Sequence, residues 1–118
     1  MRMSDEEYFR SCVAKERHLA HLLGHHEIEE FSDDAGTLWE NTTALPKWTR
    51  DWNACGSLIA TYNIAIGFGK DPLHHNEDGV MAGAVMVPFS DHPTKERAIM
   101  YAIVKAVIHQ LEHAKPCR

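Results

Sequence analysis

The segment formed by residues 46–68 constrains the fold most, because the spacing of its apolar residues changes within one short stretch. Up to residue 62 the apolar side chains recur three and four residues apart, which is the spacing of one helical face. They are Trp52, Cys55, Ile59 and Tyr62. This spacing predicts a helix over residues 50–61, with Thr49 as its N-cap.

After this helix the apolar residues alternate, with Ile64, Ile66 and Phe68 on one side. A period of two is typical of a strand that is buried on one face. The turn-forming residues between positions 70 and 78 then predict a long hairpin connection. Gly67 and Gly69 precede this connection rather than a helix start, so the pair does not indicate a phosphate-binding loop.

Two further helices flank the chain. Ser4 and Glu7 have the spacing of a capping box, and Gly24 is a natural residue for the end of the first helix. Residues 95–114 form the clearest helical pattern, which residues 91–94 cap and Pro116 ends. The polar stripe of this last helix is narrow, which predicts that most of the helix is buried. The stripe consists of Tyr101, Lys105, His109 and Glu112.

Residues 80–87 read as a second strand that is covered on both faces, because both alternate sets of side chains are apolar or small. Gly83 predicts a bulge or a close approach of a helix. Two strands alone are marginally stable, so we expect a third strand from residues 37–40 or pairing with another subunit. The predicted fold is α+β: a single domain over residues 1–118 with a small antiparallel sheet of two to three strands, sandwiched by helices in α/β/α layers.

Composition agrees with one domain, since 118 residues with 44% hydrophobic content suffice for a single core. The net charge of −5 is uneven: residues 1–46 carry −6 and residues 47–118 carry +1, so nucleic-acid binding has little electrostatic support. No apolar run approaches the roughly 18 residues of a membrane span. Cys12, Cys55 and Cys117 show no pattern of disulfide pairs. We therefore expect a soluble cytoplasmic protein without a membrane or nucleic-acid partner.

Packing and capping residues recur in a recognisable order along the chain. They are residues 13–16 and 23–24 in the first helix, Pro46, Trp48, Thr49, Asp51, Ala54, Leu58, Ile64 and Ile66 in the middle, and residues 97–99, Ala102 and 105–107 in the last helix. In this order the chain resembles the phage ABA sandwich family of small phage and prophage proteins. The resemblance implies a three-layer α/β/α fold, a phage or prophage origin and a location in the host cytoplasm. It implies no catalytic residues.

Nine histidines suggest metal binding as an alternative function. His18, His21 and His25 are spaced to share one helical face, and His109 and His113 are one turn apart. A closed zinc site needs four ligands and a catalytic site needs three, and no Cys-His or H-E-x-x-H spacing supplies them. The simpler interpretation is histidines on solvent-facing stripes, and His74 with His75 reads as a solvated turn. No metal ligand and no cofactor are therefore assigned.

Nucleophilic catalysis has only nominal candidates. Cys55 and Ser57 lie within a predicted helix, and the surrounding sequence lacks the G-x-S-x-G elbow. Cys55 is interpreted as a packing residue, because no base is predicted beside it. No catalytic residue is assigned, and the chain is not expected to be an enzyme.

Two tryptophans and an acidic segment remain as candidate contact residues. Trp48 and Trp52 are four residues apart across a helix start, so one is expected to pack while the other can face a partner, although core packing is the default for both. Residues 27–44 hold six acids and no base, which is typical of a solvated loop with one edge strand or turn near residues 37–39. An acidic contact surface for a basic partner, or a mimic of nucleic acid, are the sharper alternatives.

The leading functional hypothesis is a small phage- or prophage-encoded accessory protein that binds an unidentified protein partner or associates with itself. The alternative is a metal-binding protein or metal-dependent enzyme that uses the histidine clusters.

Overall fold

The computed structural model describes residues 4–30, 36–72 and 76–113, and within these ranges it contains three α-helices and two small antiparallel sheets. The helices are α1 (Asp5–Leu22), α2 (Trp52–Tyr62) and α3 (Lys95–Glu112). One sheet contains β1 (Ile28–Glu30), β2 (Leu38–Glu40) and β3 (Thr43–Ala44). The other contains β4 (Ile66–Asp71), β5 (Glu77–Ala82) and β6 (Val85–Pro88), and a 3-10 turn, η2 (Phe89–Asp91), leads into α3. The predicted α+β class with a small antiparallel sheet is confirmed.

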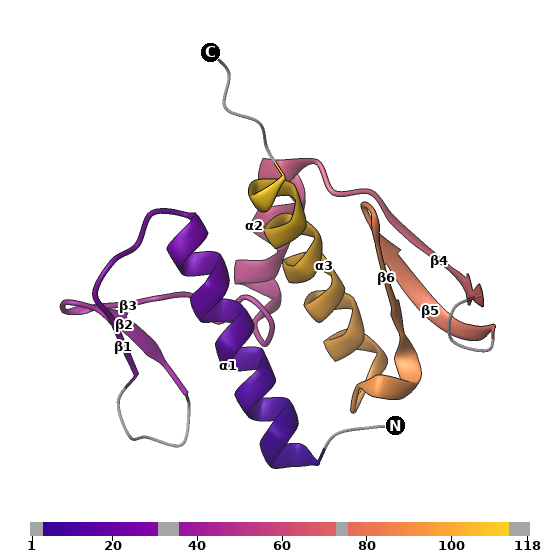
Figure 1. Ribbon diagram of the computed structural model, residues 1–118, viewed down its shortest axis with the longest axis horizontal. Coiled ribbons are helices and arrows are strands. Elements are labelled where there is room, and N and C mark those ends of the chain that lie inside the picture. Colours follow the sequence, from indigo (N-terminus) through magenta and orange to yellow (C-terminus); the bar gives the residue numbers. More distant parts are fainter. Residues whose placement is uncertain (1–3, 31–35, 73–75, 114–118) are drawn as a thin grey trace.

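The helices lie between the two sheets, with the β1–β3 sheet beyond α1 and the β4–β6 sheet beyond α3 (Figure 1). Helix α3 packs against β5, β6 and both other helices. The sequence predicted a single sheet with helices packed on both of its faces. Instead, the strand predicted at residues 37–40 pairs as β2 with β1 and β3 in a sheet of its own. The described parts of the acidic segment therefore contain three strands rather than the predicted loop with one strand, and buried Ile28 and Leu38 anchor β1 and β2 in the core.

Helix α3 is the centre of the core. Nine of its residues are buried, in agreement with the predicted narrow polar stripe. Thr94 caps it by accepting a hydrogen bond from the Arg97 backbone N–H at 3.1 Å. Tyr101 was wrongly placed in the polar stripe: it is 9% exposed, and its hydroxyl hydrogen-bonds the hydroxyl of Ser11 at 2.7 Å. No helix in the described part of the chain is long and apolar enough to cross a membrane.

Helix α1 begins as predicted. The Ser4 side chain accepts a hydrogen bond from the Glu7 backbone N–H, and the Glu7 carboxylate accepts one from the Ser4 backbone N–H. The helix ends just before Gly24, whose φ of +99° lies in the left-handed region that glycine tolerates. The capping box and the terminal glycine are both confirmed.

Helix α2 begins later than predicted. Its N-cap is Asp51, which accepts a hydrogen bond from the Asn53 backbone N–H at 3.0 Å, so the prediction of Thr49 is wrong. Thr49 is fully buried, and its hydroxyl donates to the Glu16 carboxylate on α1. The helix ends at Asn63, whose left-handed conformation turns the chain toward β4.

Strand β4 is not buried on one face as predicted. Ile64 lies before the strand and is 7% exposed, but Ile66 is 36% and Phe68 is 63% exposed. The reason is that β4 lies at the edge of its sheet, whereas α3 covers β5 and β6. The predicted hairpin connection is confirmed, since β4 pairs with β5 from Ile66 opposite Ala82 to Asp71 opposite Glu77.

Residues 80–87 form parts of two strands rather than one. Gly83, with a φ of +57°, begins the turn that joins β5 to β6, and a Cβ atom there would lie 3.7 Å from that of Ala106. The predicted close approach of a helix is thus observed at a turn. Coverage of both faces was also wrong, because Val80 is buried and Met81 is 50% exposed. All residues from 80 to 87 are small or apolar, so no polar residue in the sequence marks the position of the turn.

Candidate functional site

The histidines do not form a metal site in the described ranges. No group of three or more His, Cys, Asp or Glu side chains converges there. His18 pairs with Glu112 of α3, with 2.8 Å between Nε2 and Oε2, whereas His25 lies 2.9 Å from a carboxylate oxygen of Glu40. His18 and His25, which were predicted to share one helical face with His21, therefore contact two different elements, α3 and β2.

The pair on the last helix, His109 and His113, is stacked with its ring centroids 4.2 Å apart. The Nδ1 atom of His113 lies 2.9 Å from the His109 carbonyl oxygen. This contact with the backbone holds the His113 ring in place. Among the described residues, no third metal-ligating side chain converges with His109 and His113. His74 and His75 lie outside the described residues.

Cys55 is a packing residue, as predicted. Its side chain is fully buried, and burial raises the pKa of its thiol to about 12. A thiol with so high a pKa is protonated at neutral pH and is a poor nucleophile. The Ser57 hydroxyl donates to the Ala54 carbonyl at 2.8 Å within α2. Cys12 is also a buried free thiol, and Cys117 lies outside the described residues.

The two tryptophans differ in exposure, so the default prediction of core packing is confirmed for Trp48 and wrong for Trp52. Trp48 is 5% exposed and belongs to the core, whereas Trp52 is 46% exposed at the start of α2. Among the described residues, Trp52 is thus one of four large apolar side chains that are exposed. The other three are Ile66, Phe68 and Met81.

The acids of residues 27–44 do not present a single row of carboxylates in the described residues. Glu30 forms an ion pair with Arg10 of α1 at 2.9 Å. Glu40 binds His25 and accepts a hydrogen bond from the His26 backbone N–H. The bond with His25 is the main reason that the pKa of Glu40 lies below its usual value. Two of the acids are therefore half-buried and paired with residues of the same chain, while Asp33 and Asp34 lie outside the described residues.

Sequence reasoning missed a buried carboxylate, Glu16, which fastens the segment before α2 to α1. It is 1% exposed, and its Oε2 accepts hydrogen bonds from the Thr49 backbone N–H and hydroxyl. Arg50 donates to both carboxylate oxygens, through Nε at 3.0 Å and Nη2 at 2.6 Å. The available signal was its position, because Glu16 follows Cys12 and Val13 by one helical turn on the apolar face of α1.

A second missed feature is a buried cluster of polar aromatic residues between α1 and α3. The Tyr8 hydroxyl hydrogen-bonds Nδ1 of His92 at 2.6 Å. The His92 ring lies 4.9 Å from the Tyr101 ring. Burial is the main cause that raises the pKa of Tyr8 above its usual value, and it also raises that of Tyr101. Burial therefore favours the neutral form of both phenols, and the cluster supports packing of α1 on α3.

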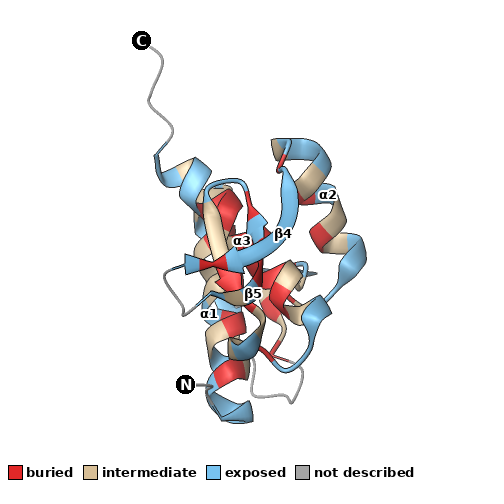
Figure 2. Cartoon of the chain, turned by 90° about the vertical axis from the view of Figure 1, so that its right-hand side faces the viewer, coloured by how far each residue is buried: buried red, intermediate tan, exposed pale blue. Residues whose placement is uncertain are grey.

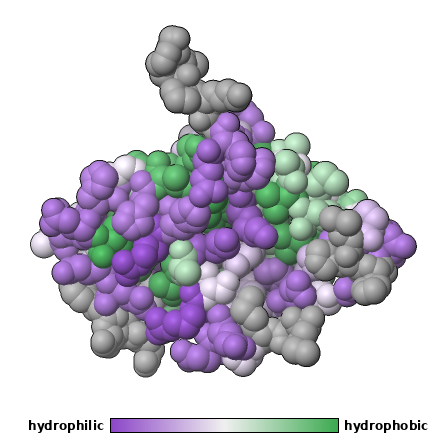
Figure 3. All heavy atoms as spheres, in the orientation of Figure 1, coloured by the Kyte–Doolittle hydropathy of each residue, from purple (hydrophilic) through white to green (hydrophobic). Residues whose placement is uncertain are grey.

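Strand β4 carries exposed apolar side chains along most of its length. All residues from Ile66 to Lys70 are exposed, and β4 is an end strand of its sheet, paired with β5 alone among the described strands. Figure 2 shows this strand facing the viewer, exposed along most of its length. In Figure 3, apolar atoms lie at the surface over the part of the molecule that contains the β4–β6 sheet. An exposed, glycine-containing edge strand with apolar side chains is a template for pairing with another strand.

A shallow hollow of about 290 Å³ adjoins this edge. It lies between β4 and the start of α3, and its walls include the rings of Phe68 and Phe89, whose centroids are 6.2 Å apart. The Lys95 ammonium lies 5.6 Å from the centroid of the Phe68 ring and 5.2 Å from that of the Phe89 ring. A cation above two aromatic rings keeps these rings in place at the surface. The backbone of β4 can therefore pair with another strand, and the hollow beside it has room for an apolar side chain.

Comparisons with models of protein families, with curated proteins and with solved structures give no match to this chain.

Proposed function

We propose that this protein is a non-enzymatic binding protein that associates with itself through β4, which adds to the β4 strand of a second copy. The observation that carries this proposal is the exposure of β4 from Ile66 to Lys70 at the edge of its sheet, with Phe68 63% exposed. Unpaired backbone groups of an edge strand gain a complete set of hydrogen bonds when a second strand is added.

The sequence of β4 suits antiparallel pairing with itself. With a two-fold axis at Phe68, Phe68 faces its own copy, Ile66 faces Lys70, and Gly67 faces Gly69. No like charges are opposite one another in this register, and aromatic pairs across strands are favourable. A closed two-fold interface of this kind makes one dimer and no filament.

The hollow beside the edge supports this choice of partner. In the proposed register, the partner's Phe68 lies next to Phe68, on the face where Phe89 and Lys95 form the walls of the hollow. A single added strand buries little area, so the association is expected to be weak and to depend on concentration.

Sedimentation analysis over a range of protein concentrations tests the proposal. The wild-type protein is expected to form dimers as its concentration rises, and Phe68→Glu is expected to remain monomeric, because two facing carboxylates repel. Met81→Glu is the matched control: it puts the same charge at another exposed apolar residue, on the neighbouring strand and away from the edge. A wild-type monomer at all concentrations, or equal loss of dimer in both variants, contradicts the proposal.

The wider role proposed here is that of an accessory protein of a phage or prophage in the host cytoplasm. Its support is the resemblance of the packing and capping residues to the phage ABA sandwich family. The identity of the neighbouring genes tests this role, and bacterial housekeeping genes on both sides would contradict it.

A further inference from the structure

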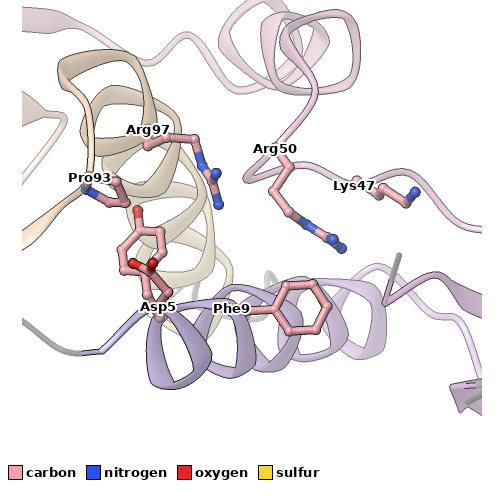
Figure 4. Close-up of a pocket in the computed structure, with 7 residues that line it drawn as sticks. Asp5, Phe9, Lys47, Arg50, Pro93 and Arg97 are labelled. Atoms are coloured by element: carbon pink, nitrogen blue, oxygen red, sulfur yellow. The ribbon is translucent and has the colours of Figure 1, made fainter. Parts of the chain in front are cut away.

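A second hollow, of about 540 Å³, lies on another part of the molecule (Figure 4). Its walls come from three segments that are distant in sequence: the first turns of α1, the segment before α2 and the start of α3. Three of its lining residues are basic, namely Lys47, Arg50 and Arg97, and Asp5 is acidic. A net positive lining is notable in a chain with a net charge of −5, because it concentrates anions at one place.

Arg97 is the basic residue of this lining that has a buried donor without an acceptor. Its Nε atom is buried and has no hydrogen-bond partner. Its Nη2 atom donates to the Cys12 sulfur at 3.5 Å, and sulfur is a weak acceptor. The guanidinium carbon lies 5.2 Å from the centroid of the Tyr8 ring, so an aromatic face supports the group. No carboxylate of the described residues forms an ion pair with Arg97, and burying such an N–H group without an acceptor is costly.

Arg50 has a different role on the facing wall. Its guanidinium is held by both carboxylate oxygens of Glu16 and donates to the Gly36 carbonyl at 3.2 Å. Its charge is therefore largely balanced by Glu16, and it forms a fixed wall beside the Phe9 ring. Figure 4 shows Arg97 and Arg50 extending toward the same space, whereas Lys47 extends away from Arg97. Arg97 is therefore the principal contact for an anion, and Lys47 contributes at longer range.

We infer that this hollow binds a small organic anion, whose carboxylate or phosphate group contacts Arg97 and whose flat apolar part lies along the wall that includes Phe9 and Pro93. A guanidinium matches the geometry of both oxyanions with paired N–H donors. The volume falls within the usual range for small-molecule sites, and aromatic side chains in the lining suit a flat ligand. This site does not involve β4, so its test is independent of the proposed self-association.

NMR titration of the isotopically labelled protein tests the inference with four probes at millimolar concentration: phenyl phosphate, benzoate, inorganic phosphate and benzyl alcohol. Phenyl phosphate or benzoate is expected to shift the signals of Phe9 and Arg97, and the tighter of the two identifies the oxyanion. Benzyl alcohol, which lacks the charge, is expected to cause no such shifts. Equal binding of inorganic phosphate and phenyl phosphate would overturn the assignment of an organic ligand, and absence of shifts with all probes would overturn the site.

Arg97→Gln is expected to weaken binding by about tenfold or more, as for loss of a charge-assisted hydrogen bond. Lys15→Gln is the matched control, because it removes one positive charge of α1 that does not line this hollow, and its binding is expected to be unchanged. The amide spectrum shows whether each variant is folded. If Arg97→Gln does not fold, Arg97→Lys keeps the charge and removes the paired donors, and it is expected to weaken binding as well. Unchanged binding in a folded Arg97 variant would overturn the inference.

Discussion

The two ends of the segment 46–68 differ in how firmly they are held. At its start, Thr49 and Arg50 are fastened to the buried carboxylate of Glu16, and Trp48 is in the core. At its end, β4 lies at a sheet edge with Phe68 exposed. The difference teaches that one short segment contains both a main attachment point of the fold and the surface proposed for association. Substitutions at the start should therefore affect stability, and those at the end should affect association.

The largest expected effect on stability concerns the start of the segment, where Thr49 and Arg50 bind Glu16. Glu16→Ala should lower the free energy of unfolding by about 3 kcal/mol or more, because it leaves the Arg50 guanidinium, which is 13% exposed, without its anion. Glu6→Ala, which removes a 79%-exposed partner of Arg10 on the same helix, should change it by less than about 0.5 kcal/mol. Denaturant unfolding measures both. If Glu16→Ala lowered the free energy of unfolding only slightly, packing alone would hold the segment that contains Thr49 and Arg50.

A pair of glycines in opposite strands sharpens the comparison between the interior and the edge of the sheet. Gly79 of β5 and Gly69 of β4 face each other. A Cβ atom at Gly79 would meet the Val87 carbonyl oxygen at 2.5 Å, whereas one at Gly69 would meet nothing within 4 Å. Gly79→Ala should therefore destabilise the protein by about 2 kcal/mol, and Gly69→Ala should be neutral or slightly stabilising. Thermal unfolding of both variants tests this, and equal effects would contradict the observed difference in space.

The smallest of the stability effects concerns alkaline pH. Burial raises the pKa of Tyr8 in the folded protein, so the folded state keeps a proton that the unfolded state releases above pH about 10. The stability that this gives is present below pH 10 and is lost as the pH rises further. Tyr8→Phe should reduce the steepness of this loss, because phenylalanine does not titrate. Unfolding measured from neutral to alkaline pH would contradict the account if both proteins showed the same slope.

The sequence predicted local features well, because capping and periodicity are local. Ser4 with Glu7 and the terminal Gly24 were recognisable from their spacing. Thr49 was misread as a cap because its partner, Glu16, is 33 residues away in the sequence, and no local pattern encodes that contact. Gly83 was misread as part of a strand because a tight turn between small apolar residues leaves the run unbroken.

The candidate sites were harder to predict than the fold. The spacing of Trp48 and Trp52 indicated that one of them can face a partner, but it did not indicate which, and core packing was the default for both. The alternation of β4 predicted a buried face, and only the position of α3 over β5 and β6 shows that Phe68 lies beyond the helical cover. The Arg97 hollow draws on three distant segments, so periodicity could not reveal it.

The most direct test of the central claim is an intermolecular NMR experiment on a sample that mixes labelled and unlabelled protein. Self-pairing of β4 predicts intermolecular contacts between Ile66 of one copy and Lys70 of the other, and between the two Phe68 rings. Contacts that involve other elements, or no intermolecular contact at concentrations where the protein is dimeric, would contradict it.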